Sequence, residues 1–311
     1  MLDARRLLLL RELRDRGSIA AVAEALSYTP SAVSQQLAIL RRETGVELVE
    51  RIGRGVRLTD AGRTLAAHAD AVLEQLEAAE AAIESATPGQ LRGTARVAAY
   101  QTAARAMLGP AITDLAESHP GIRLELAELE AELALPLLRT GEADVVVAEE
   151  YTFAPRPRDP GAERHPLGVD RVLLALAPGH PAAASTGAIH LRDLEQEPWA
   201  TSRPGTLFAE SLVRACRTIG GFEPDIRHRA NDVGLLLQLA ADGHAVVLVP
   251  AMGVAVRPEG VVLREVAGRG LTRDVFAVTR RGTAERPAIA AVLGVLRAQA
   301  ERLGLRSRGT S

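Results

Sequence analysis

The sequence predicts an α/β protein in three parts: an N-terminal winged helix-turn-helix, a long linker helix and a larger C-terminal domain of two α/β lobes. Residues 18–60 combine two short helices, a tight turn and an arginine-bearing hairpin. Residues 60–87 contain no glycine or proline after Gly62, as expected of one long helix. From residue 91 onward, aliphatic strands alternate with helices, a pattern that favours a parallel sheet covered on both faces.

Capping residues define the two short helices. Ser18 is a suitable N-cap for a helix that runs to about Leu26, and residues 27–28 form the turn. Thr29 can cap the free amides of the second helix. Pro30 suits the first helical position, because the N–H that proline lacks would have had no partner there. The spacing therefore predicts two helices joined by a turn of two residues.

The second helix is expected to expose a polar face. Val33, Leu37 and Leu40 recur at intervals of four and three residues and would face the core. Short hydroxyl and amide side chains near a helix N-terminus can reach base edges and phosphates in a major groove. The candidate DNA-binding residues of this helix and its cap are Thr29, Pro30, Ser31, Ser34 and Gln35.

A cationic hairpin follows the helix pair. Arg51, Arg54 and Arg57 recur at three-residue intervals around Gly53 and Gly55. Such a wing would lie along a phosphate backbone or enter a minor groove, so the three arginines join the candidate DNA-binding set. The alternative is an ordinary solvated β-turn, which the adjacent helix pair disfavours.

Local charge agrees with DNA binding, although the whole chain has a net charge of −2. Residues 1–63 contain eleven Arg against eight Asp and Glu, a net charge of +3, whereas residues 64–91 carry −5. Phosphates respond to the local charge, because salt screens interactions beyond about 10 Å. The N-terminal domain is therefore the basic part of the chain.

The composition favours a soluble cytoplasmic protein with no membrane partner. Only four consecutive leucines precede the return of charged residues near the N-terminus, too few for a signal-peptide core or a membrane span. Cys216 is the single cysteine, so the chain has no internal disulfide and offers no cysteine metal cluster.

No catalytic or metal site is indicated, and no cofactor is expected. The seven histidines lack a metal-ligand spacing such as H-x-x-x-H, and the chain has no G-x-S-x-G, P-loop or G-x-G-x-x-G motif. Cys216 lies among Val213, Ala215 and Ile219 of an expected helix. We interpret it as a small buried hydrophobe rather than a redox sensor.

The N-terminal motifs resemble those of the LysR-type transcriptional regulators. The resemblance covers almost the whole chain and implies a C-terminal effector domain of the periplasmic-binding-protein type. Two positions depart from the family pattern: Arg41 stands where an acidic residue usually follows the leucine, and Val49 replaces a usual phenylalanine, which suggests a smaller plug under the wing. The matching segments and residues are 20–26, TPSAVSQ at 29–35, Leu40, Gly45, Leu48, Arg51 and LTDAG at 58–62.

A narrow apolar stripe marks the long helix. Its acidic residues mostly lie off the stripe, which favours pairing with one partner helix. The resemblance implies that the partner is the same helix of a second subunit, so that two reading helices would meet the half-sites of an inverted repeat. The alternative is packing of this helix on its own domain. The predicted dimerisation residues are Leu65, Val72, Leu76 and Ile83.

The chain is divided into domains at 1–60, 61–88 and 91–311, and the last comprises two lobes. Lobe I contains 91–165 and 270–304, lobe II contains 166–269, and the chain crosses between them near 164–170 and 266–273. Pro136 should lie in the first turn of its helix, and Asn231 should cap another. The expected strands are 94–99, 122–129, 143–148, 172–177, 198–202, 226–229, 245–250 and 274–279. The expected helices are 102–119, 133–140, 206–219, 231–242 and 287–303.

A ligand site is expected in the cleft between the lobes, at the carboxyl ends of strands. Arg203 and exposed helix amides favour an anionic group, so we hypothesise a small carboxylate-bearing effector. Glu149 and Glu150, at the end of a strand near the hinge, would instead favour a cationic ligand. Thr102 and Thr206 can alternatively be helix caps, and Arg203 a solvated loop residue. The candidate effector-binding residues are Tyr100, Gln101, Thr102, Glu149, Ser202, Arg203 and Thr206.

We expect a cytoplasmic, effector-responsive transcriptional regulator that binds double-stranded DNA as a homodimer or homotetramer, with RNA polymerase as a further partner. A solute-binding protein is one alternative, because two lobes alone would suit that role, but the residues before 60 argue against it. An enzyme on a similar α/β pair is another, and the lack of a convergent acid–base or nucleophile set argues against it. The effector, the operator and the direction of regulation stay open.

Overall fold

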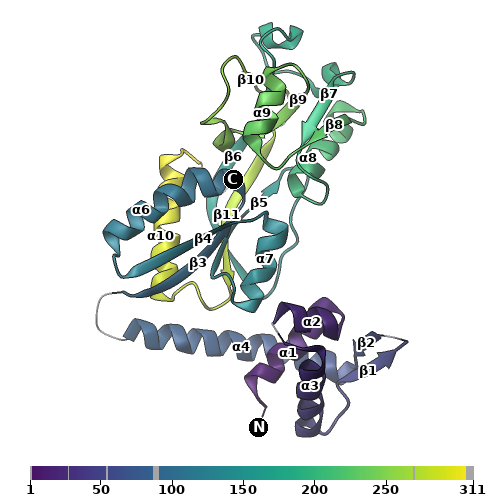
Figure 1. Cartoon of the computed structure of the whole chain (residues 1–311), viewed down its shortest axis with the longest axis vertical. Coiled ribbons are helices and arrows are strands. Elements are labelled where there is room, and N and C mark those ends of the chain that lie inside the picture. The colour runs from purple at the N-terminus through teal and green to yellow at the C-terminus, as the bar shows by residue number, and fades with distance from the viewer. Residues whose placement is uncertain (1, 27, 54, 87–90, 269, 306–311) are drawn as a thin grey trace. The chain divides into compact units, whose positions relative to one another are not determined.

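A computed structural model of the chain contains two compact units (Figure 1). The described residues are 2–26, 28–53, 55–86, 91–268 and 270–305. Residue 27 of the predicted turn at 27–28 therefore lies outside the described residues. The wing arginine Arg54 also lies outside them. None of the helices within these ranges is both long and apolar enough to cross a membrane. The first unit comprises Met1–Pro88 and Arg281–Pro287, and the second comprises Gly89–Arg280 and Ala288–Ser311.

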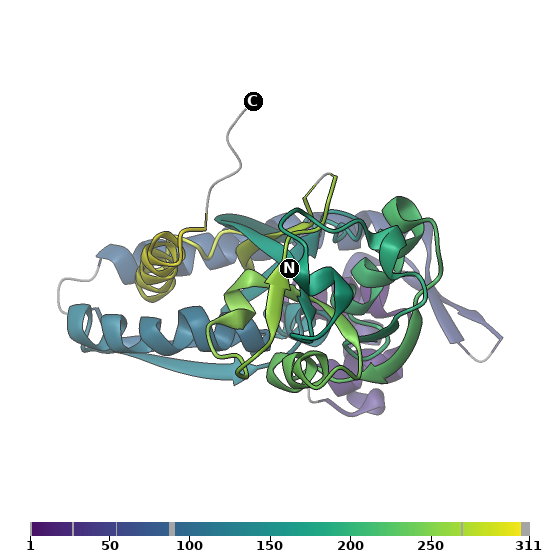
Figure 2. The same ribbon diagram turned by 90° about the horizontal axis from the view of Figure 1, so that it is seen from above.

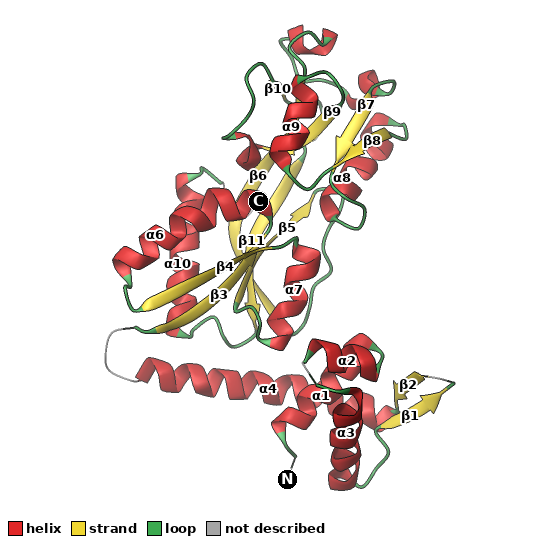
Figure 3. Ribbon diagram, viewed as in Figure 1, coloured by secondary structure: helices red, strands yellow, loops and turns green. Residues whose placement is uncertain are grey.

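The first unit contains the predicted helix-turn-helix and its hairpin (Figure 3). Both predicted caps are confirmed: the Ser18 hydroxyl accepts a hydrogen bond from Ala21 N, and the Thr29 hydroxyl accepts one from Ala32 N, each at 3.2 Å. One helix that was not predicted precedes them. The elements are α1 (Ala4–Arg16), α2 (Ile19–Ala25), α3 (Pro30–Thr44), β1 (Val49–Ile52) and β2 (Gly55–Leu58).

A single apolar cluster holds these elements together. Val33, Leu37 and Leu40 of α3 are buried, as predicted, against Leu10 of α1 and Leu48 before the hairpin. Burying a leucine side chain contributes about 1.5–3 kcal/mol. The burial of this face fixes which side of α3 remains exposed to solvent.

The long helix α4 (Asp60–Ala86) is continuous over 27 residues, as predicted. Ala66 and Ala69 in its first half are buried, and Arg14 of α1 pairs with Asp70 at 2.8 Å. Val72 and Leu76, further along the stripe, are 43 % and 45 % exposed. The first turns therefore pack on their own domain, while the later part of the stripe has an exposed apolar surface.

The second unit is built on one nine-stranded sheet in the order β4-β3-β5-β11-β6-β9-β7-β8, with β10 beside β6. The predicted parallel sheet is wrong, because the sheet is mixed. The two long strands that pass between the lobes, β6 and β11, run antiparallel to each other and to all their other neighbours. The strands are β3 (Gly93–Ala99), β4 (Ile122–Glu128), β5 (Val145–Tyr151), β6 (Ala162–Leu176), β7 (Pro198–Thr201), β8 (Asp225–Arg229), β9 (Val246–Pro250), β10 (Val262–Arg264) and β11 (Thr272–Arg280).

Helices cover the sheet in both lobes. The last helix, α10 (yellow in Figure 2), lies beside α6, and its Gln299 and Arg302 donate to Asp114 of α6 at 2.7 and 2.6 Å. π-Helical stretches at Ala104–Leu108 and Cys216–Gly220 continue α5 and α8. The α-helices are α5 (Gln101–Ala103), α6 (Gly109–Ser118), α7 (Ala131–Thr140), α8 (Leu207–Ala215), α9 (Val233–Ala241) and α10 (Pro287–Arg302), and 3₁₀ turns occupy Pro181–Ala184, Leu191–Leu194 and Ala251–Val254.

Two local predictions are wrong. Pro136 is the sixth residue of α7 rather than part of its first turn, because this helix begins at Ala131, two residues before the predicted start. Asp232, not Asn231, caps α9, and its carboxylate accepts from Leu235 N at 2.9 Å. The side chain of Asn231 instead accepts a hydrogen bond from Arg203 N at 3.1 Å.

Candidate DNA interface and effector cleft

Four of the predicted DNA-contact residues lie on the exposed face of α3: Pro30, Ser31, Ser34 and Gln35. Ser34 Oγ donates to Pro30 O at 2.9 Å, and Ser31 Oγ lies 2.9 Å from Thr29 Oγ1. The two hydroxyls are therefore satisfied locally while they remain exposed. The start of α3 presents polar, uncharged groups that can exchange these local partners for groups on a nucleic acid.

The hairpin exposes arginine side chains on both of its strands. Arg51 lies on β1 and Arg57 on β2. Arg57 Nη2 donates to Glu50 Oε1 at 2.7 Å, because Glu50 and Arg57 face each other in the strand register. The arginine spacing alone did not predict this pairing, but the acid directly before Arg51 is a signal for it. Both partners are exposed, so the ion pair is weak and Arg57 can exchange it for a phosphate.

A buried ion pair lies where the two long strands cross between the lobes. Arg273 of β11 and Asp170 of β6 are 2 % and 3 % exposed, and Arg273 Nε and Nη2 donate to Asp170 Oδ2 at 3.0 and 2.8 Å. Met252 N donates to Asp170 Oδ1 at 3.1 Å. Sequence analysis missed this pair. Its signal was a charged residue at the end of each predicted crossing, Asp170 in 164–170 and Arg273 in 266–273.

The three predicted residues that follow β3 lie around this ion pair and at the lobe boundary. Thr102 Oγ1 accepts from Arg273 Nη2 at 2.9 Å, so Thr102 is not a simple helix cap. The buried Tyr100 ring lies 4.9 Å below the guanidinium carbon of Arg273. Gln101 Oε1 accepts from Val233 N, the first amide of α9 in lobe II, at 2.9 Å.

The three predicted residues of lobe II lie before α8, as expected. Thr206 Oγ1 accepts from Ala209 N at 3.3 Å, so Thr206 is the N-cap of α8, and Ser202 Oγ lies 2.5 Å from the same hydroxyl. Arg203 N donates to Asn231 Oδ1 at 3.1 Å, while the Arg203 side chain is exposed. Ser202 is buried, whereas Arg203, Pro204 and Gly205 are exposed.

Two glutamates and an arginine of lobe I meet at the start of α8. Glu132 Oε1 accepts from Arg156 Nη2 at 2.9 Å and from Leu207 N, the first amide of α8, at 3.2 Å. Arg156 Nη2 also lies 3.7 Å from Glu149 Oε1. Sequence analysis missed Glu132 and Arg156, which are 24 residues apart and carry no motif. Side-chain oxygens of lobe I thus occupy the first amide of both α8 and α9.

Glu149 is buried in β5, which continues past its predicted end at 148 to Tyr151. Burial raises the pKa of Glu149 to about 8, although Arg156 and Arg273 act in the opposite direction. Glu149 is therefore largely protonated at neutral pH. This makes the cleft less negative than its glutamate content implies.

Two family models match the chain. The bacterial regulatory helix-turn-helix proteins of the lysR family match residues 4–63, and the LysR substrate binding domain matches residues 88–301. The chain belongs to the LysR family. It is therefore a DNA-binding transcriptional regulator with an effector-binding domain, and neither a solute-binding protein nor an enzyme.

This LysR-type chain is similar to other regulators over most of its length. It is 30 % identical over 244 residues to a probable hydrogen peroxide-inducible genes activator of Mycobacterium avium, covering 78 % of this chain and 76 % of that protein. It is 28 % identical over 295 residues to the HTH-type transcriptional regulator MetR of Escherichia coli (strain K12), covering 92 % and 87 %. A full-length OxyR variant from Pseudomonas aeruginosa has the same fold, with a TM-score of 0.64 at 21 % identity and coverage of 96 % and 95 %.

The two departures from the LysR pattern are accommodated locally. Arg41 Nη1 donates to Glu47 Oε1 at 2.7 Å, and both side chains are exposed. Val49 is partly buried against the N-terminal apolar cluster, in agreement with a smaller plug under the wing. Neither change alters the exposed face at the start of α3.

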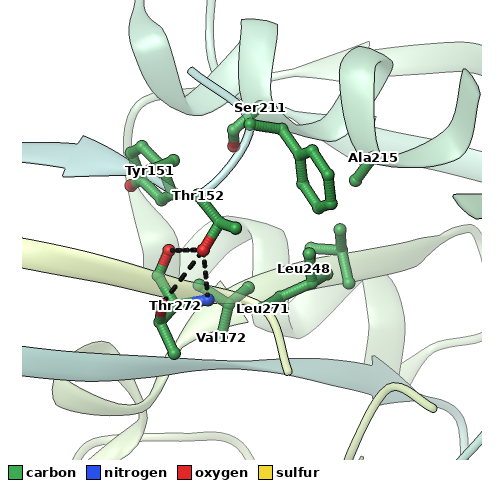
Figure 4. A pocket seen from close by; sticks show the side chains of 9 residues that line it. Tyr151, Thr152, Val172, Ser211, Ala215, Leu248, Leu271 and Thr272 are labelled. Atoms are coloured by element: carbon green, nitrogen blue, oxygen red, sulfur yellow. Dashed lines mark hydrogen bonds between the residues drawn. The ribbon is translucent and has the colours of Figure 1, made fainter. Parts of the chain in front are cut away.

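A pocket of about 230 Å³, counting the solvent at its mouth, lies between α8 and the ends of the crossing strands (Figure 4). Thr152 Oγ1 donates to Thr272 O at 3.0 Å at its polar edge. None of the predicted effector-binding residues lines it. Its lining is Tyr151, Thr152, Phe153, Val172, Ser211, Ala215, Leu248, Leu271 and Thr272.

Cys216 is fully buried in the lobe II core of this LysR-type regulator. Burial raises the pKa of the Cys216 thiol to about 12, and Glu223 adds to the effect. Peroxide oxidises the thiolate form of cysteine, and at neutral pH only a very small fraction of Cys216 is a thiolate. The structure supports the interpretation of Cys216 as a buried hydrophobe. Within the described residues, no cluster of three or more His, Cys, Asp or Glu side chains is placed to hold a metal ion.

Glu149→Gln is expected to change the pH dependence of stability. The folded protein keeps the Glu149 proton up to a pKa of about 8, whereas the unfolded chain loses it near the ordinary value of 4.5. The free energy of unfolding of the wild type therefore falls as pH rises between these values. We expect the melting temperature of Glu149→Gln to equal that of the wild type near pH 4.5 and to exceed it at pH 8 by roughly 2 °C or more.

Thermal melts of both proteins at several pH values measure this difference. Glu142→Gln, an exposed carboxylate in the same lobe, is the control and should differ from the wild type by the same amount at every pH. A constant difference for Glu149→Gln would contradict the assigned protonation.

Hydrogen peroxide is expected to leave Cys216 unmodified in the folded protein, because the thiol is buried and protonated. Mass spectrometry after peroxide treatment should find oxidised Cys216 in the urea-unfolded chain only. DNA affinity should be the same before and after treatment. Rapid trapping of a sulfenic acid at Cys216 in the folded protein would contradict this interpretation.

Proposed function

We propose that this regulator reads an inverted-repeat operator with two copies of α3 and its hairpin, and that a small-molecule effector bound between the lobes changes this reading. The observation that carries the proposal is the exposed polar face of α3, whose opposite face is buried. The regulator acts in the cytoplasm, and RNA polymerase is its proposed downstream partner.

In this proposal, α3 enters the major groove. Ser31, Ser34 and Gln35 contact base edges, and Thr29 and Pro30 lie against the backbone at the helix start. The amide of Gln35 can make a bidentate contact with adenine. The hairpin residues Arg51, Arg54 and Arg57 bind phosphates or the minor groove.

The proposed dimer forms along the later part of α4. Val72, Leu76 and Ile83 are 43 %, 45 % and 69 % exposed and fall on one heptad stripe, and exposed apolar stripes favour association. Leu65 is partly buried against its own domain, so it supports the base of the helix rather than the centre of the interface. Further association of the effector domains would give a tetramer.

The effector is proposed to act on the contacts that span the lobes. Gln101 and Glu132 each bind the first amide of a lobe II helix, so a ligand nearby can favour one lobe arrangement over another. Such a ligand needs different affinities for the two arrangements. A carboxylate on the effector, as hypothesised from the sequence, would meet the exposed guanidinium of Arg203.

Fluorescence anisotropy with a duplex from upstream of the protein's own gene and a scrambled duplex tests DNA reading. We expect tighter binding to the native duplex and an affinity that falls steeply with salt concentration. Arg51→Ala should reduce the magnitude of the salt slope by about one, and Gln35→Ala should lower discrimination by about 1–3 kcal/mol. Gln75→Ala on α4 is the control. Equal, salt-insensitive binding to both duplexes would contradict the proposal.

Leu76→Glu is expected to weaken the dimer, because it buries a charge in the apolar stripe. Sedimentation at low micromolar concentration should show a shift from dimer toward monomer, with unchanged helix content by circular dichroism. Gln75→Glu adds the same charge at the adjacent exposed position and should leave the mass unchanged. A Leu76→Glu protein with the mass of the wild type would exclude this interface.

A further inference from the structure

We propose that the cleft between the lobes takes a ligand that carries a protonated amine, and that Glu132 and Glu149 receive this amine. The inference rests on the proposed function, because it names the chemistry of the effector. Glu132 comes from the first turn of α7 and Glu149 from the middle of β5. They lie on either side of Arg156, at 2.9 and 3.7 Å from the same guanidinium nitrogen.

Unpartnered buried oxygens point to a ligand that donates hydrogen bonds. Glu149 Oε2, Glu132 Oε2 and the Tyr100 hydroxyl are buried and have no hydrogen-bond partner within the described part of the chain. Glu149 and Tyr100 are each only 4 % exposed. An unsatisfied buried acceptor is unfavourable, so a donor from a ligand would be favoured there. An ammonium group has three donors and no acceptor, so it can donate to such carboxyl oxygens, and a tyrosine hydroxyl can accept as well as donate.

Three carboxyl groups gather around this position. Glu130, at the cap of α7, joins Glu132 and Glu149, and burial together with Glu132 and Glu128 raises the pKa of Glu130. The guanidinium of Arg156 contacts Glu132 and Glu149, whereas Arg273 is paired with Asp170. A cationic ligand beside these carboxyl groups would favour their ionised forms.

The groups that would bind an anion here are already occupied. Leu207 N and Arg156 both donate to Glu132, and Val233 N donates to Gln101. Helix N-termini and arginines are the usual sites for carboxylates. A carboxylate at this position would have to displace Glu132, whereas an amine can donate a hydrogen bond to Glu132. A carboxylate on the same molecule can still reach Arg203, which is exposed.

Amine binding would change both a contact between the lobes and the protonation of Glu149. Glu132 Oε1 also accepts from lobe II, so an amine that draws on Glu132 changes a contact between lobes. Glu149 is largely neutral at pH 7, and an adjacent ammonium favours its ionised form. Ligand binding should therefore release up to one proton, which a purely structural carboxylate would not do.

Thermal shift and calorimetry of the full-length protein at pH 7 test the proposal. The probes are the proteinogenic L-amino acids and putrescine, with the matched deaminated carboxylates and decarboxylated amines. We expect at least one amine to bind while its deaminated counterpart does not. The binding enthalpy should vary with the ionisation enthalpy of the buffer, because a proton is released.

Variants separate binding from folding. Glu149→Gln should weaken the amine at least tenfold and abolish the proton release, and Glu142→Gln should change neither. Glu132→Gln keeps an oxygen for Leu207 N and should also weaken the amine. Circular dichroism and the melting temperature confirm that each variant is folded.

Three results would overturn the amine proposal: equal binding of the deaminated carboxylates, stabilisation by no amine in the panel, or unchanged affinity in Glu149→Gln. Anisotropy with the operator duplex on the same samples distinguishes this failure from that of the proposed function. Intact operator binding with no amine response rejects the amine alone. Loss of selective operator binding by the wild type rejects the regulator model.

Discussion

The buried pair of Arg273 and Asp170 is the interaction on which the effector domain depends. It ties β11 to β6 at the point where both strands pass between lobes, and its remaining hydrogen bonds go to Thr102 and Met252 N. A buried ion pair stabilises a fold only when its other donors and acceptors are also satisfied, and removing one partner leaves an uncompensated charge. Because Arg273 is buried and paired with Asp170, it positions the cleft rather than offering a charge to a ligand.

Polar contacts across the lobes explain why the cleft differs from an empty anion site. Two helix N-termini of lobe II, which by themselves would attract an anion, are each bound by an oxygen from lobe I. These contacts hold the lobes together without a ligand and leave the acidic oxygens near Arg156 as the unsatisfied groups. The same atoms therefore determine both the resting arrangement and the chemistry that can alter it.

The two units divide the regulatory task between separate cores. The N-terminal core fixes the exposed face of α3, whereas the effector sheet fixes the contacts between the lobes. In the proposed mechanism, an effector influences DNA binding through a coupling free energy between lobe arrangement and subunit association. The exposed half of α4 is the element that would mediate this subunit association.

The sequence by itself determined the short-range features: the caps at Ser18 and Thr29, the buried face of α3, the continuous α4 and the alternation of strands and helices. These depend on residues within a few positions of each other, so their signals lie in local spacing. The tertiary structure alone decided the antiparallel crossing strands and the pairing of Arg273 with Asp170, 103 residues away. It also decided the contact of Glu132 with Leu207 N, across 75 residues. Such partners carry no common motif, because only the folded sheet brings them within hydrogen-bond distance.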